Sequence, residues 1–176
     1  GDAVGNDTIA LKKVISQMGY RTEIYAENID VRLPKKTALP ISKLTSVNKD
    51  DIIIYHKSTG TRMSFTLDKW DCHRMMIYHN ITPPSFFREY SMKSTELSEL
   101  GIKGMKYLSD KIEYCMADSD FNKNDLSEAG YSCPVDVRPI LIPFDDYKKA
   151  PDEAIIKKYC DGYVNIIFVG RIAPNK

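Results

Sequence analysis

Short apolar runs, each followed by a polar loop, recur along the chain and predict the strands of a sheet. Between them lie segments with helical apolar spacing or with helix-capping residues at their start. The predicted strands cover residues 21–27, 51–55, 72–78, 114–117, 135–142 and 164–169, and the predicted helices or helical turns cover 8–18, 41–47, 61–69, 83–111, 118–126 and 152–159. Strands that alternate with helices favour an α/β fold, a three-layer sandwich around a mainly parallel sheet.

The composition is that of an ordinary globular protein. The 176 residues are 43% hydrophobic and 28% charged, which suits one α/β domain or one domain with part of a second. The net charge of +1 gives no basic field for nucleic acid or an anionic membrane. No apolar run approaches the roughly 20 residues of a membrane helix. Cysteines occur at positions 72, 115, 133 and 160 without a Cys-x-x-Cys pair, which favours reduced thiols in a cytoplasmic protein.

Two histidines stand where predicted strands end. His79 follows an apolar run and precedes Asn80 and two prolines, which cannot continue a strand. His56 follows the preceding run in the same way, after a tyrosine and before a small polar loop. A single histidine of this kind is commonly a surface residue in a turn. Because ligands bind at the carboxyl ends of parallel strands, two matched histidines predict a cleft at that edge.

A glycine-bearing segment, residues 1–5, precedes the first predicted helix. Asn6 or Asp7 can cap that helix by accepting a backbone N–H, and Gly19 can end it. A glycine loop at a helix N-terminus is a natural anion site, whereas a plain turn is the alternative because lone glycines are weak signals. Such a loop normally follows a strand in a doubly wound fold, so we expect a strand ahead of Gly1.

Two further patterns could bind a nucleotide. Glu27 lies 22 residues after Gly5, close to the spacing of about 20 residues at which dinucleotide-binding folds place the acidic residue that binds the ribose. The glycines here, however, do not form the Gly-x-Gly-x-x-Gly motif of those folds. Arg171 and Lys176 follow the last predicted strand in a loop with Gly170. Two cations at a strand end suit a diphosphate, the arginine as a fork and the lysine as a point charge. The alternative for Arg171 and Lys176 is a solvated terminus with two ordinary surface cations.

Four segments together resemble the family-4 retaining glycosyltransferases of the GT-B fold. They are Gly-Asp-Ala-Val-Gly-Asn-Asp at 1–7, Ile-Tyr-His-Asn-Ile-Thr-Pro at 77–83, Ala-Asp-Ser at 117–119 and Phe-Val-Gly-Arg-Ile-Ala-Pro-Asn-Lys at 168–176. The segments occur in the family's order across nearly the whole chain. The resemblance implies the Rossmann-like N-terminal domain, which holds the sugar acceptor opposite a domain that holds a nucleotide-sugar.

The resemblance also implies roles for individual residues. His79 would lie beside the transferring sugar as the catalytic residue, and Arg171 and Lys176 would neutralise the donor diphosphate. The loop with Gly1, Gly5 and Asn6 would line the floor of the cleft, with His56 and Asn80 near it. Transfer would go from a nucleotide-sugar to the hydroxyl of a saccharide or lipid-linked acceptor, with retention, in polysaccharide or glycoconjugate synthesis. The sequence contains no paired carboxylates that would suggest a divalent metal site, so we expect the transfer to need no metal or other cofactor. Contact with a membrane surface is compatible with a lipid-linked acceptor.

The chain departs from the family pattern beyond residue 176, where the family's acidic donor-sugar motif would follow. We therefore expect an acceptor domain over residues 1–145, a linker and helix over 146–163, and the first strand and loop of a donor-binding domain over 164–176. On that expectation the chain alone is an inactive fragment. The rival interpretation is a stand-alone α/β module that binds a nucleotide or another ligand.

Overall fold

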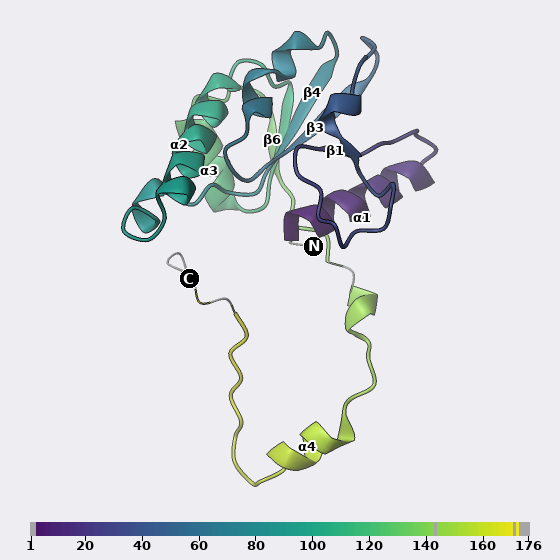
Figure 1. Cartoon of the computed structure of the whole chain (residues 1–176), viewed down its shortest axis with the longest axis vertical. Helices are drawn as coiled ribbons and strands as arrows, with labels where there is room; N and C mark the ends of the chain where they lie inside the picture. Colours follow the sequence, from purple (N-terminus) through teal and green to yellow (C-terminus); the bar gives the residue numbers. More distant parts are fainter. Residues whose placement is uncertain (1–2, 143, 171, 173–176) are drawn as a thin grey trace. The chain divides into compact units, whose positions relative to one another are not determined.

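The computed structural model describes residues 3–142, 144–170 and 172 (Figure 1). The chain divides into two units, Gly1–Leu141 and Ile142–Lys176. The first unit contains all the paired strands of the described residues. No helix in the described parts of the chain combines the length and apolar character needed to span a membrane.

An all-parallel sheet of four strands organises the first unit. Helices α2 (Met92–Tyr107) and α3 (Asp120–Glu128) connect successive strands and flank the sheet (Figure 1). In spatial order the strands are β3 (Ile52–Lys57), β4 (His73–Tyr78), β5 (Tyr114–Ala117) and β6 (Val135–Val137). The fold is therefore the predicted Rossmann-like α/β sandwich. The last strand is shorter than the predicted 135–142, since Pro139 has no N–H for the ladder.

The core lies around β4, which has a partner strand on each side. Met76, Ile77 and Tyr78 are consecutive and all buried, as expected of a parallel strand covered on both faces. Side chains from α2, α3 and the neighbouring strands complete this core, and Leu108, Cys115, Ala117 and Leu126 are 0% exposed.

The backbone of α2 packs closely against the backbone of the loop after β3, at Gly60. A Cβ on Gly60 would collide with the carbonyl of Leu97 and lie 2.8 Å from the nitrogen of Gly101. The helix begins at Ser91, whose hydroxyl accepts the N–H of Ser94 at 3.2 Å. The predicted helical stretch 83–111 therefore comprises a 3-10 turn, η4 (Pro84–Phe86), and then α2.

The predicted first helix is present as α1 (Ala3–Gln17) but begins earlier than the capping pattern indicated. Gly5, Asn6 and Asp7 lie within the helix, so the prediction that Asn6 or Asp7 caps it is wrong, and these residues form no glycine loop. Asp7 lies on the buried side of the helix, and only 5% of this residue is exposed. Gly19 has φ = 94° just past the end of the helix, as a C-terminal glycine should.

The segment from Arg21 to Lys69 contains less regular structure than predicted. Of the predicted strand 21–27 only β1 (Tyr25–Ala26) forms, paired in parallel with β2 (Leu39–Pro40). The predicted helical turns at 41–47 and 61–69 are present as 3-10 turns. They are η1 (Ile41–Lys43), η2 (Arg62–Phe65) and η3 (Leu67–Lys69).

The second unit has two short helical segments, η5 (Phe144–Tyr147) and α4 (Glu153–Tyr159). Asp152 caps α4 by accepting the N–H of Ala154 at 2.9 Å, which confirms the predicted helix at 152–159. Residues 164–169 form no strand, and Val164, Ile166 and Phe168 are at least 90% exposed. The strand prediction for these residues is wrong because an apolar run becomes a strand only where a sheet edge pairs with it.

Candidate functional site at the carboxyl edge of the sheet

The carboxyl ends of three adjacent strands bring two histidines and an aspartate together. His56 is the next-to-last residue of β3, and His79 and Asp118 follow β4 and β5 directly. The parallel register continues past the strands, since His79 N–H donates to Lys57 O at 2.8 Å and Asp118 N–H to Tyr78 O at 3.3 Å. The predicted meeting of His56 and His79 at this edge is confirmed.

The three side chains form one series of hydrogen bonds. Nδ1 of His79 lies 2.8 Å from Oδ2 of Asp118, and Nε2 of His79 lies 2.9 Å from Nδ1 of His56. The imidazole planes of the two histidines are inclined by 11° and their centroids are 5.2 Å apart. With a 2.9 Å contact between nitrogens, that separation requires both nitrogens to lie close to the line between centroids. The rings therefore meet edge to edge in a hydrogen bond and are not stacked face to face.

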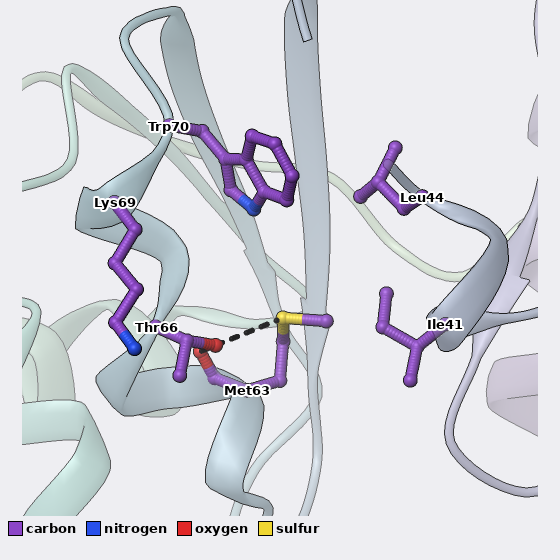
Figure 2. A pocket seen from close by; sticks show the side chains of 6 residues that line it. All are labelled: Ile41, Leu44, Met63, Thr66, Lys69 and Trp70. Carbon is purple, nitrogen blue, oxygen red and sulfur yellow. Dashed lines mark hydrogen bonds between the residues drawn. The ribbon is translucent and has the colours of Figure 1, made fainter. Parts of the chain in front are cut away.

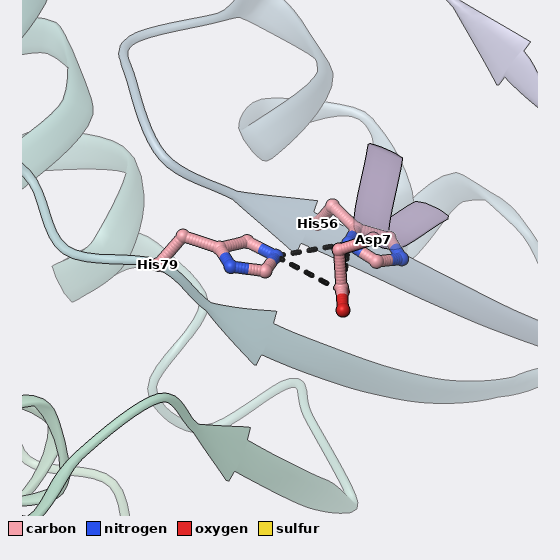
Figure 3. Close-up of side chains that lie close together, drawn as sticks. All are labelled: Asp7, His56 and His79. Carbon is pink, nitrogen blue, oxygen red and sulfur yellow. Dashed lines mark hydrogen bonds and ion pairs between the residues drawn. The ribbon is translucent and has the colours of Figure 1, made fainter. Parts of the chain in front are cut away.

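Asp7 reaches the same place from α1 (Figure 3). Its Oδ2 lies 3.7 Å from Nδ1 of His56 and 4.0 Å from Nε2 of His79. Its other oxygen, Oδ1, accepts the backbone N–H of Leu141 at 2.8 Å. Asp7 is thus fixed between the end of the first unit and the two imidazoles.

Burial controls the charges of this cluster. It lowers the pKa of His56 to about 4, helped by the neighbouring His79 and opposed by Asp7. His56 is therefore neutral near pH 7. Burial also raises the pKa of Asp118, against the opposing effect of His79. Oδ1 of Asp118 is buried and has no hydrogen-bond partner among the described residues.

The hydrogen bonds assign the tautomer that each ring has in its neutral form. Asp118 can only accept when ionised, so Nδ1 of His79 carries the proton and its Nε2 accepts. Nδ1 of His56 then donates to that Nε2, which leaves Nε2 of His56 as an acceptor. Nε2 of His56 has no hydrogen-bond partner within the described residues, and the side chain is 12% exposed. The His79 side chain, at 1% exposed, has both nitrogens engaged.

Asn80 gives the backbone a sharp turn beside this cluster. Its φ of 73° lies in the left-handed region, which asparagine enters more readily than most residues. The strand direction changes here, immediately after His79 and before the prolines. The side chain of Asn80 is exposed. In this structure Asn80 therefore affects the site through the backbone turn that it allows after His79.

A pocket of about 180 Å³ lies between the loops after β3 and β4 and the start of α2. Five of its lining residues carry hydroxyl groups and three are apolar. The lining residues are Ser58, Thr59, Ile81, Thr82, Phe87, Ser94, Leu97 and Ser98. We refer to it as the hydroxyl pocket. The sequence analysis did not predict this pocket. The hydroxyl residues at 58, 59 and 82, just past the strand ends, could have indicated it, but the contribution of α2 depends on packing.

Lys57 holds part of the wall of the hydroxyl pocket in place through a hydrogen bond to the backbone of Thr59. Its residue is 0% exposed, and Nζ donates to Thr59 O and to Ser64 Oγ, both at 3.0 Å. Burial lowers the pKa of Lys57 to about 8, opposed by the charge of Glu27. The lysine therefore fixes the loop after β3 from inside. Glu27, the candidate ribose ligand, accepts the N–H of Met63 at 3.1 Å.

A second, more apolar pocket of about 240 Å³ lies between η1 and the η2–η3 segment (Figure 2). Its lining residues are Ile41, Leu44, Met63, Thr66, Lys69 and Trp70. Thr66 Oγ1 donates to Met63 Sδ at 3.5 Å within it. None of these residues belongs to the histidine cluster or to the hydroxyl pocket.

Two other predicted site residues, Gly5 and Asn6, belong to α1 and are not part of the cluster. Gly1, Arg171 and Lys176 lie outside the described residues. Sequence reasoning included Asp7 and Asp118 in the segments that resemble the glycosyltransferase family, and Asp7 also as a candidate cap, but assigned neither to the site. Asp118 could have been found from its position after β5, which matches that of His79 after β4. Nothing in the spacing indicated Asp7, which reaches the site through helix packing.

Searches against family models, curated proteins and solved structures gave no match for this chain.

Proposed function

We propose that this chain is the acceptor-binding domain of a retaining glycosyltransferase that resembles family 4. The carrying observation is the Asp118–His79–His56 series of hydrogen bonds at the carboxyl edge of a parallel sheet. Ligands of open α/β sheets bind at this edge. The resemblance of residues 77–83 to the family segment supplies the reaction class, and the hydroxyl pocket supplies a site for a polyhydroxylated acceptor.

The hydroxyl pocket suits a saccharide by its mixture of groups. Its hydroxyl-bearing residues can exchange hydrogen bonds with sugar hydroxyls, and Phe87 offers an apolar surface for the C–H face of a sugar ring. Phosphate recognition is assigned to Arg171 and Lys176, as the resemblance implies. No metal is needed if these cations neutralise the departing diphosphate.

In the transfer, the bond between the sugar's anomeric carbon and the diphosphate oxygen breaks. A bond forms from that carbon to the acceptor oxygen, on the same face of the ring, and the acceptor's proton passes to the released diphosphate or to water. We assign His79 to the side of the transferring sugar. Asp118 keeps the proton on Nδ1 of His79, so Nε2 can accept a hydrogen bond from a sugar hydroxyl once that hydroxyl replaces His56.

The test uses the protein expressed from the whole reading frame that contains this chain. It is incubated with a panel of nucleotide-sugars and saccharide or lipid-linked acceptors, and released nucleoside diphosphate and glycosylated product are measured. His79→Ala is expected to lower kcat by about 100-fold, the size of loss seen when one preorganised hydrogen-bonding group of an active site is removed. His73→Ala is the matched control, because His73 is an exposed histidine at the opposite end of the same strand.

Product formation that is equal in the two variants would refute the role of His79. Ligand binding without release of nucleoside diphosphate from any donor would refute the transferase and favour the rival binding module. Phe87→Ala tests the acceptor site separately. It is expected to raise the acceptor KM several-fold while kcat changes little, since it removes contact surface on the acceptor.

A further inference from the structure

Three potential metal ligands converge beneath the carboxyl edge of the sheet. Oδ2 of Asp7, Nδ1 of His56 and Nε2 of His79 all lie within 4.8 Å of one another (Figure 3). They come from α1, from the end of β3 and from the residue after β4. We propose that Asp7, His56 and His79 form a binding site for a zinc ion. The proposed sugar transfer requires no metal, but the two sites share the side chain of His79.

The separations of the ligand atoms suit a small divalent ion. They are 2.9 Å between the two imidazole nitrogens, and 3.7 Å and 4.0 Å from Asp7 Oδ2 to those nitrogens. A circle through three atoms so spaced has a radius of about 2.1 Å, which equals the usual zinc distance to nitrogen and oxygen ligands. An ion in the middle therefore reaches all three atoms at bonding distance.

Binding requires small movements of the rings. In the structure the two nitrogens face each other, and a tetrahedral ion needs them about 3.3 Å apart, with lone pairs turned toward the metal. The His56–His79 hydrogen bond therefore opens when the ion enters, and the proton of His56 moves from Nδ1 to Nε2 through solvent, so the ring stays neutral and Nδ1 binds the metal. A fourth position stays available for water.

Hydrogen bonds outside the ligand atoms already hold two of the three ligands in place. Asp118 accepts the Nδ1–H of His79 at 2.8 Å, which directs the lone pair of Nε2 toward the proposed ion. Carboxylates commonly orient metal-bound histidines in this way. The Leu141 N–H binds Oδ1 of Asp7 at 2.8 Å and leaves Oδ2 for the metal.

Charge balance also favours a cation here. Asp7 is 5% exposed, and its only ion-pair candidates among the described residues are His56 and His79. A buried carboxylate without a cationic partner is costly, and a divalent ion compensates it. Two imidazoles and one carboxylate select zinc over magnesium or calcium, which prefer all-oxygen sites.

A zinc ion would have a structural and a regulatory effect. It would tie α1 to the ends of β3 and β4, which Asp7 now approaches at 3.7 Å and 4.0 Å. It would also occupy Nε2 of His79, the atom assigned above to the transferring sugar. Zinc would then compete with that sugar.

The test is a titration of the 176-residue chain with Co²⁺, followed by displacement with Zn²⁺. We expect one equivalent of Co²⁺ to give visible d–d absorption without a thiolate charge-transfer band, and Zn²⁺ to abolish it and raise the thermal midpoint. Asp7→Asn and His56→Gln should each lose the absorption, and Asp118→Ala should weaken binding by about 10- to 100-fold, as loss of such supporting carboxylates does. His73→Ala should bind like the unmodified chain.

Circular dichroism melts establish that each variant is folded before its affinity is compared. Retention of full Co²⁺ absorption by folded Asp7→Asn and His56→Gln variants would overturn the site. A thiolate band, or loss of binding in His73→Ala, would place the metal elsewhere and also overturn it. Because the titration measures metal binding by the chain itself, its outcome is independent of whether sugar transfer is observed.

Discussion

The carboxylate of Asp118 lies 2.8 Å from Nδ1 of His79 and determines which nitrogen of that ring carries the proton. The two residues are 39 positions apart in the sequence but become neighbours because β4 and β5 pair in parallel and end together. The sheet therefore aligns the acceptor of one strand end with the donor of the next. The same alignment adds His56 from β3.

This contact predicts the tautomer of His79. In the unmodified chain, long-range ¹H–¹⁵N correlation spectra should show the His79 proton on Nδ1. Asp118→Ala should shift the ring toward the Nε2–H form, because the acceptor that stabilises Nδ1–H is gone. Asp120→Ala, which removes an exposed carboxylate from the start of α3, is the control and should change nothing. An unchanged His79 pattern in Asp118→Ala would contradict the assignment.

The close packing of α2 predicts the cost of a single methyl group. Gly60→Ala should lower the free energy of unfolding by about 3 kcal/mol, because the new Cβ collides with the Leu97 carbonyl and the backbone must move. Gly170→Ala is the control, since its Cβ would meet only the Phe168 ring at 3.1 Å, in an exposed segment. Urea denaturation measures both. A Gly60→Ala midpoint equal to that of the control would show that the backbone yields without cost.

Local pattern predicted most of the sheet, because three strands are short apolar runs bounded by polar or proline-containing loops. The matched Tyr-His layout at the ends of β3 and β4 was enough to predict that His56 and His79 lie together. The pattern did not predict the start of α1. A capping residue is recognisable in sequence, but Asn6 and Asp7 are also compatible with a helix interior when packing favours it, and Asp7 is buried there.

The apolar run 164–169 shows the opposite limitation. It has the strongest strand-like composition in the chain, yet forms no strand. Strand formation depends on a partner edge, which composition does not encode. The Asp7–His56–His79 cluster was unpredictable for a related reason, since it requires one face of a helix to be placed over two strand ends.

Burial predicts the order in which the cysteines react. Cys160 is exposed, whereas Cys72 and Cys115 are buried, and burial raises the pKa of both buried thiols. Because the thiolate is the reactive form, a brief pulse of iodoacetamide should label Cys160 first and Cys115 only after unfolding in urea. Peptide mass spectrometry measures the order. Labelling of Cys115 in the folded chain at the rate of Cys160 would contradict the burial of β5.

The exposed pair His73–Glu113 predicts a pH dependence. His73 Nδ1 donates a hydrogen bond to Glu113 Oε2 at 2.7 Å. This hydrogen bond raises the pKa of His73 and lowers the pKa of Glu113. Stability from the raised histidine pKa is complete below about 6.5, the unfolded value, and is lost as pH rises through the folded value. Stability from the lowered glutamate pKa is present above about 4.3 and is lost at more acid pH.

Glu113→Gln should therefore reduce the thermal midpoint more at about pH 5.5 than at about pH 8. It should also return the pKa of His73 toward its ordinary value in an NMR titration, and the effect on the midpoint should be small because both groups are exposed. Glu99→Gln, on the exposed side of α2, controls for the loss of a negative charge. An equal loss at both pH values would show that the pair contributes nothing.

The exposed run at 164–169 predicts self-association. Ile166 and Phe168 are 94% and 90% exposed within a contiguous apolar segment, the kind of segment that promotes aggregation. Ile166→Lys/Phe168→Lys should raise the concentration at which the chain remains monomeric, without changing the thermal midpoint of the sheet domain, because neither side chain is buried. Val31→Lys/Met92→Lys adds the same charge at two isolated exposed positions, which are 97% and 78% exposed. Light scattering against concentration separates the two effects: equal gains in both double variants would assign the improvement to net charge and not to this segment.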